Sequence, residues 1–106
     1  MEPREKIESI VNTNPVVLFM KGSPQFPQCG FSARTVEVLK SCDIEFLPVD
    51  VIAEPEFRQN LPAFSEWPTF PQLFIGGELV GGCDIVMDMY RNGDLQRMAD
   101  EATTDA

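Results

Sequence analysis

Histidine is absent from the 106-residue sequence. Its absence removes the usual general base of hydrolases, the Ser-His and Cys-His catalytic pairs, and most zinc sites. Basic residues are scarce as well, because 8 lysines and arginines stand against 17 aspartates and glutamates, giving a net charge of −9. Nucleic-acid binders grip phosphates with clustered basic side chains, so this balance argues against a nucleic-acid partner. Any chemistry must therefore use Cys, Lys, Arg, Asp, Glu or a group borrowed from another molecule.

Long apolar runs are also missing, since none approaches the roughly 18 residues of a membrane span. The charged first residues lead into no signal-peptide core, and three cysteines are an odd number. Together these features favour a cytoplasmic protein with free thiols and no membrane association. The 43% hydrophobic content fits one domain over residues 1–106, ordered over about 4–100 and followed by a short acidic tail.

Apolar periodicity and turn residues predict helices alternating with strands. The run 16–20 is apolar throughout, which favours a central strand covered on both faces. Pro48 cannot donate to a sheet ladder and places the strand at 45–51 on an edge. The expected order is a helix before Asn14-Pro15, strand 16–20, loop 21–28, a helix from Cys29 or Gly30, strand 45–51, a helix from Glu54-Pro55, strands 72–75 and 78–81 around Gly76-Gly77, and helices capped by Asp84 and Asp94. This order predicts a thioredoxin-like α/β fold with a four-stranded mixed sheet.

Three finer expectations follow from the same patterns. Pro62 should end or kink its helix, because proline lacks a backbone donor. The tail from Thr103 to Ala106 should fray. In the second helix, one apolar side should carry Phe31, Val38, Leu39 and Cys42.

Cys29 is the best candidate nucleophile. It follows a strand and a loop and stands where a helix begins, so the free N–H groups and the helix dipole would favour its thiolate. Lys21 could add positive charge, although an inert, buried cysteine is an equally good reading of position alone. Ser32 occupies the place of the second cysteine of a dithiol motif. A mixed disulfide on Cys29 must therefore be released by another thiol, such as glutathione or a distant cysteine.

The segment Cys-Gly-Phe-Ser at 29–32 resembles the active-site motif of the CGFS-type monothiol glutaredoxins. The resemblance runs from roughly Lys6 to Met98. Three further blocks agree in order and spacing: Met20-Lys21-Gly22-Ser23-Pro24, Trp67-Pro68-Thr69-Phe70-Pro71-Gln72 and Gly81-Gly82-Cys83-Asp84. It implies a glutaredoxin fold, glutathione binding, and a [2Fe-2S] cluster that bridges two subunits.

The resemblance implies that glutathione would contact several residues that match family positions. Lys21 and Arg58 would meet its glycyl carboxylate, and Phe70, before a cis bond to Pro71, would pair its backbone with the peptide. Asp84 and the start of its helix would hold the γ-glutamyl group.

Two further positions beside the proposed pocket also match the family. Gly82 would let the backbone approach the ligand closely, and Cys83 would lie beside the pocket. Cys83 could pair with Cys29 under oxidation or be an unreactive neighbour, whereas Cys42 is best read as a packing residue.

Cys29 from each of two subunits would ligate the cluster, with two glutathione thiols completing the four ligands. The partners implied are a second copy of the chain, a BolA-like protein and apo iron–sulfur proteins. An alternative function is a glutathione-dependent oxidoreductase that removes glutathione from mixed disulfides through Cys29. A third is an adaptor whose partner surface matters more than its thiol.

Overall fold

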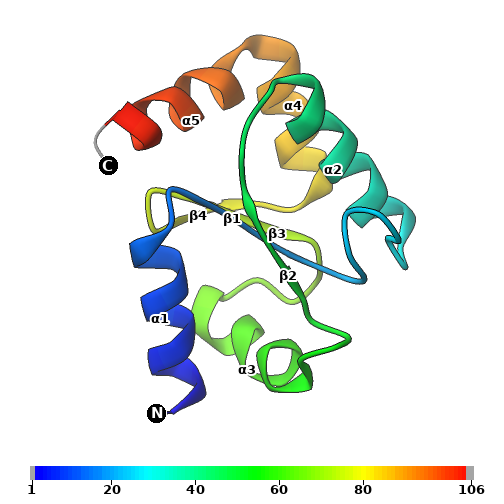
Figure 1. The fold of residues 1–106 in the computed structure, drawn as a ribbon, viewed down its shortest axis with the longest axis vertical. Coiled ribbons are helices and arrows are strands. Elements are labelled where there is room, and N and C mark those ends of the chain that lie inside the picture. Colours follow the sequence, from blue (N-terminus) through cyan, green and yellow to red (C-terminus); the bar gives the residue numbers. More distant parts are fainter. Residues whose placement is uncertain (1, 105–106) are drawn as a thin grey trace.

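The computed structural model describes residues 2–104 and follows the predicted order of elements (Figure 1). No helix in this described range is long and apolar enough to cross a membrane. The elements are α1 (Pro3–Thr13), β1 (Val16–Met20), α2 (Gly30–Ser41), β2 (Leu47–Asp50), α3 (Pro55–Ser65), β3 (Gln72–Ile75), β4 (Glu78–Gly81), α4 (Cys83–Asn92) and α5 (Asp94–Thr104).

The sheet is mixed and has the order β2-β1-β3-β4. Strand β1 pairs parallel with β2 and antiparallel with β3, and β3 pairs antiparallel with β4 across the Gly76-Gly77 turn. All five residues of β1 are buried, and Pro48 lies in the edge strand β2. The thioredoxin-like fold, the central strand and the edge strand are thus confirmed.

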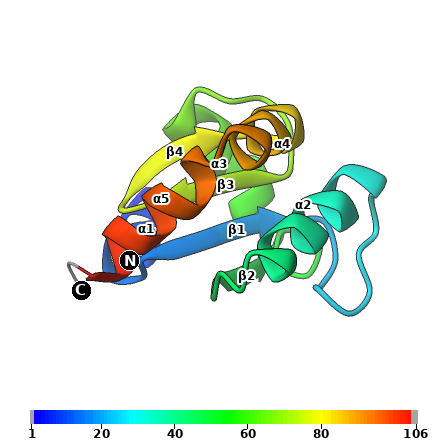
Figure 2. The same cartoon turned by 90° about the horizontal axis from the view of Figure 1, so that it is seen from above.

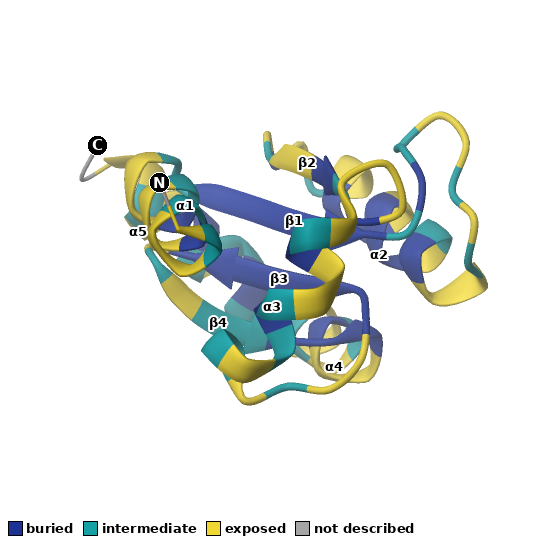
Figure 3. Cartoon of the chain, turned by 90° about the horizontal axis from the view of Figure 1, so that it is seen from below, coloured by how far each residue is buried: buried dark blue, intermediate teal, exposed yellow. Residues whose placement is uncertain are grey.

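Helices cover both faces of the sheet, with α1 and α3 on one side and α2, α4 and α5 on the other (Figures 1 and 2). Successive side chains of β1 point to opposite faces, so Val17 and Phe19 pack with α1 and α3. Leu18 and Met20 pack with the other three helices. Burial is therefore concentrated in β1 and β3, and exposure on the outer helix faces (Figure 3).

The ends of two helices differ from expectation. Helix α3 continues through Pro62 to Ser65, so the expectation that this proline ends it is wrong. The buried side chains of Phe57 and Leu61 hold the helix against the sheet, and it ends where Glu66 adopts a left-handed conformation with φ 58°. Helix α5 extends to Thr104, so fraying from Thr103 is also wrong; residues 105 and 106 lie outside the described range.

Phe31 is a third correction. Val38 and Leu39 are buried and Cys42 packs partly against the same cluster, but Phe31 is 59% exposed. Phe31 is in the first turn of α2 and belongs to neither core cluster, so helical periodicity alone placed it wrongly.

Candidate functional site

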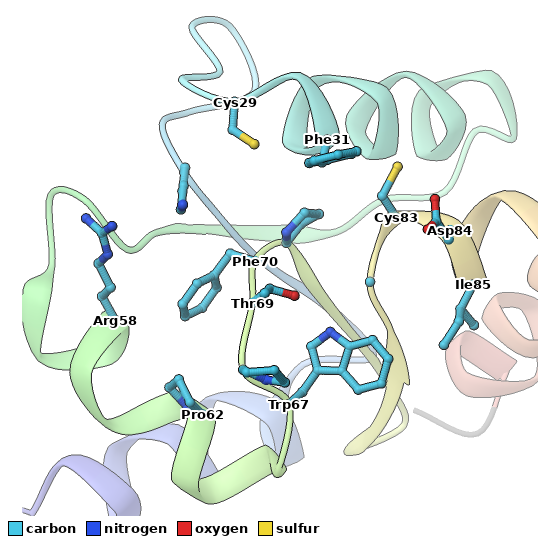
Figure 4. A pocket seen from close by; sticks show the side chains of 14 residues that line it. Cys29, Phe31, Arg58, Pro62, Trp67, Thr69, Phe70, Cys83, Asp84 and Ile85 are labelled. Atoms are coloured by element: carbon cyan, nitrogen blue, oxygen red, sulfur yellow. The ribbon is translucent and has the colours of Figure 1, made fainter.

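A pocket of about 780 Å³ opens between the start of α2, helix α3, the 67–71 segment and the start of α4. Figure 4 shows Cys29 on one side of it, Arg58 on a second, and Cys83 with Asp84 on a third. The structure brings together all of the candidate residues, which are Lys21, Cys29, Arg58, Phe70, Gly82, Cys83 and Asp84. Cys42 does not line the pocket, because it lies at the opposite end of α2 from Cys29.

Cys29 is the N-cap residue of α2, with extended backbone angles and a half-buried side chain. Its sulfur points into the pocket (Figure 4). The pKa of the Cys29 thiol is lowered, chiefly because the backbone N–H of Ser32 donates a hydrogen bond to the sulfur. Desolvation opposes this shift, whereas the N–H of Phe31, the charge of Lys21 and the Ser32 hydroxyl reinforce it. The thiolate is therefore favoured, as expected for a nucleophile at a helix N-terminus.

Ser32 does more than replace a second cysteine, because its hydroxyl also links two parts of the site. Its side chain is completely buried, and its Oγ accepts a hydrogen bond from the backbone N–H of Lys21 at 3.2 Å. Because Oγ accepts this hydrogen bond through a lone pair, its own proton is free to be donated to the sulfur of Cys29. Ser32 thus ties the end of β1 to the thiol.

The loop that leads to Cys29 is fixed by a residue that sequence reasoning missed. Asp50, the last residue of β2, accepts a hydrogen bond at Oδ1 from the N–H of Gly22 at 3.0 Å. The same oxygen accepts the N–H groups of Ile52 at 2.9 Å and Ala53 at 3.3 Å. An aspartate at a strand end before a turn is the available sequence signal, because this side chain readily accepts nearby backbone donors.

The 67–71 segment forms the wall facing Cys29. The peptide bond between Phe70 and Pro71 is cis, as expected. Neither the backbone N–H nor the carbonyl of Phe70 forms a hydrogen bond to another residue of the described range. Gln72 is fully buried and donates through Nε2 to the carbonyls of Trp67 at 2.9 Å and Thr69 at 3.1 Å. The Phe70 backbone is thus available to a ligand while its neighbours are held.

The third wall is the start of α4, where the expected N-cap is wrong. The N-cap is Gly82, Cys83 is the first helical residue, and Asp84 follows it inside the helix. No side chain of the described residues caps this N-terminus, so its first N–H groups and the positive end of the helix dipole remain available. Cys83 is buried, whereas the carboxylate of Asp84 is exposed at the pocket. Asp94 likewise is the first residue of α5 and not its cap, and its carboxylate pairs with Arg97 at 3.0 Å.

The charges of the pocket are arranged for an extended ligand. Lys21 and Arg58 line it and form no ion pair with any carboxylate of residues 2–104. In Figure 4, Arg58 lies across the pocket from Asp84. A molecule with a carboxylate at one end and an ammonium at the other would find complementary charges, with the thiol of Cys29 within the same pocket.

A thioredoxin-like fold with a single activated thiol at the start of a helix defines a monothiol member of the thiol-redox proteins. The family model of glutaredoxin matches residues 16–80. The chain belongs to the glutaredoxin family, as the sequence resemblance predicted. Two relatives are both named glutaredoxin 4. The protein of Haemophilus ducreyi is 50% identical over 104 residues, 98% of this chain and 97% of its own. That of Escherichia coli K12 is 52% identical over 97 residues, 92% of this chain and 84% of its own.

Solved structures agree with this assignment. The solution structure of reduced poplar apo GrxS14 has a TM-score of 0.82 and 44% identity, covering 95% of this chain and 93% of its own. The crystal structure of a buckwheat glutaredoxin–glutathione complex has a TM-score of 0.85 and 29% identity, covering 95% of this chain and 90% of its own. The four-stranded sheet and the helices around it are therefore those of glutaredoxins.

Proposed function

We propose that this glutaredoxin binds glutathione in the pocket beside Cys29. The observation that supports this most is the set of groups left without a partner within residues 2–104: the cations Lys21 and Arg58, the backbone of Phe70, and the start of α4, which has no side-chain cap. The glycyl carboxylate would lie at the cations. The peptide of glutathione would pair with Phe70, and the γ-glutamyl group would lie at α4 with Asp84. The likeness to a glutaredoxin that forms a glutathione complex supports the same ligand.

We further propose that the main role is to carry a [2Fe-2S] cluster in the cytoplasm. The side chains of one subunit can supply only some of the ligands that such a cluster needs. Within residues 2–104, no three His, Cys, Asp or Glu side chains gather to hold a metal ion, and Cys29 is the thiol with the lowered pKa. One chain would therefore supply one thiolate, and the other ligands would come from glutathione and a second subunit. A cluster held by ligands outside the polypeptide can be passed on to apo iron–sulfur proteins or shared with a BolA-like partner.

Glutathione-dependent reduction of mixed disulfides is the second candidate, and the activated thiol in an open pocket favours it. The Cys29 thiolate would attack the glutathione sulfur of a mixed disulfide and release the other thiol. A second glutathione thiolate would then attack the new mixed disulfide, which yields glutathione disulfide and regenerates Cys29.

Calorimetric titration with reduced glutathione tests the binding site. The Arg58→Gln variant should bind about tenfold more weakly than the parent, because it loses a charge-assisted contact of about 1.4 kcal/mol. Arg34→Gln is the matched control, because Arg34 is exposed, lies outside the pocket and forms no ion pair within the described range. Equal losses in the two variants would refute the assigned site.

Anaerobic reconstitution with iron, sulfide and glutathione separates the two functions. Visible absorption and a doubled mass in solution should appear in the parent and in Cys42→Ser, whose substituted residue lies at the far end of α2. Both signals should be lost in Cys29→Ser or without glutathione. Colour and dimerisation that survive either change would contradict the carrier. Rapid turnover of a glutathione mixed disulfide by the parent, without cluster formation, would favour the oxidoreductase.

A further inference from the structure

Trp67 and Gly82 meet on the side of the pocket away from Cys29. A Cβ atom placed on Gly82 would lie 3.2 Å from Nε1 of Trp67 and 3.4 Å from the carbonyl oxygen of Pro71. Nε1 of Trp67 is buried and has no hydrogen-bond partner among residues 2–104. The indole therefore closes the space into which a side chain at position 82 would project.

The backbone conformation of Gly82 does not require glycine. Its φ of −93° and ψ of −166° are extended angles that other residues adopt. The preceding Gly81 differs, because its φ of +145° disfavours any side chain. What would crowd a Cβ atom at Gly82 is thus the indole of Trp67, which would have to shift by a few tenths of an ångström.

Trp67 is itself held by the protein interior. Its carbonyl accepts Nε2 of the fully buried Gln72 at 2.9 Å, and its N–H donates to Oγ of Ser65 at 3.2 Å. Figure 4 shows the indole beside the segment that leads into α4. The backbone of Trp67 is therefore anchored on both sides, and its indole contacts the N-cap residue whose position sets the first N–H groups of α4.

We propose that Trp67 is a positioning residue for the pocket: through its contact with Gly82, the indole fixes the start of α4 relative to the 67–71 segment. The ligand involved rests on the glutathione binding proposed above. If the indole did not hold Gly82, the backbone donors of α4 would move relative to the Phe70 backbone. A ligand that spans both walls would then lose affinity even though no group that touches it had changed.

A double-mutant cycle tests this role. Gly82→Ala forces its Cβ against the indole, so glutathione should bind about tenfold more weakly by calorimetry. Trp67→Phe removes Nε1 and the second ring and should weaken binding about threefold. In the double variant, the smaller ring accommodates the new Cβ, so binding should be at least threefold tighter than in Gly82→Ala. Losses that simply multiply would overturn the proposal.

Two measurements do not depend on glutathione. Hydrogen exchange of the Val86 amide, which donates to the Gly82 carbonyl at 3.0 Å, should accelerate in Trp67→Phe, relative to amides of α1, which lie on the other face of the sheet. Trp67 is the single tryptophan, so its fluorescence should change directly in Gly82→Ala. If the parent bound no glutathione while both signals changed, the proposed function would fail but the positioning contact would stand. Unchanged exchange and fluorescence would overturn the positioning role.

Discussion

Replacing Asp50 by Ala should destabilise the protein by about 2–3 kcal/mol, because one carboxylate oxygen accepts three backbone N–H groups. A hydrogen bond to a charged acceptor contributes roughly 1.5–3 kcal/mol. The Gly22 donor is partly buried and has a distance of 3.0 Å, so we assign it most of this value. The donors of Ile52 and Ala53 are exposed, and water replaces the carboxylate there, so they add only a fraction.

Thermal and urea unfolding measure this effect. For a domain of this size, about 1 kcal/mol lowers the Tm by about 4–8 °C, so Asp50→Ala should unfold about 8–24 °C below the parent. Asp50→Asn retains an acceptor oxygen without the charge and should lose about half as much. Glu45→Ala is the matched control, since Glu45 is an exposed carboxylate just before β2 with no hydrogen bond in the described range. A loss for Asp50→Ala within about 0.5 kcal/mol of this control would refute the reasoning.

Three further outcomes are expected near the thiol. Ser32→Ala removes the hydroxyl, the smallest of the contributions that lower the pKa of Cys29, and keeps the backbone N–H that lowers it most, so the pH profile of Cys29 alkylation should move slightly to higher pH. Because the folded-state pKa of Cys29 is lowered, the folded protein binds fewer protons between that pKa and the unfolded value. The free energy of unfolding should therefore rise with pH across this interval, and Cys29→Ser should abolish the rise. Gly22→Ala should cost at least about 2 kcal/mol in urea unfolding, because φ is +92° and its Cβ would lie 2.5 Å from a backbone oxygen of the same loop. Gly30→Ala meets no atom within 4 Å and should stay within about 0.5 kcal/mol of the parent.

The parts of the fold that were predicted correctly from the sequence are those with a clear local pattern. The unbroken apolar run of β1 indicated a strand buried on both faces, and its five buried residues agree. Pro48 indicated an edge strand because proline lacks the backbone N–H that a central strand needs for pairing on both sides. The helix at Gly30 was predictable because the loop before it is rich in proline and glycine and the apolar spacing resumes after it.

Other features depended on contacts between residues distant in the sequence. Asp84 has a strong intrinsic preference for an N-cap, yet the N-cap of α4 is Gly82, two residues earlier, and Gly82 lies against Trp67, which is distant in the sequence. Asp50 fixes the loop that leads to Cys29 through a hydrogen bond from Gly22, 28 residues earlier, and no local pattern connects the two. The candidate residues themselves came from motif resemblance, and the residues that hold them in place came only from the structure.

The net charge of −9 makes the position of the few cations decisive. Arg4, Lys6, Arg91 and Arg97 each pair with a nearby carboxylate, so their charges are locally neutralised. The long-range field of the protein repels an anion, but salt at physiological concentration screens exposed charges beyond about 8 Å. Inside the pocket, a carboxylate would therefore respond mainly to Lys21 and Arg58, aided by the helix N-termini. An acidic chain can thus bind an anionic peptide, provided that these two cations stay unpaired.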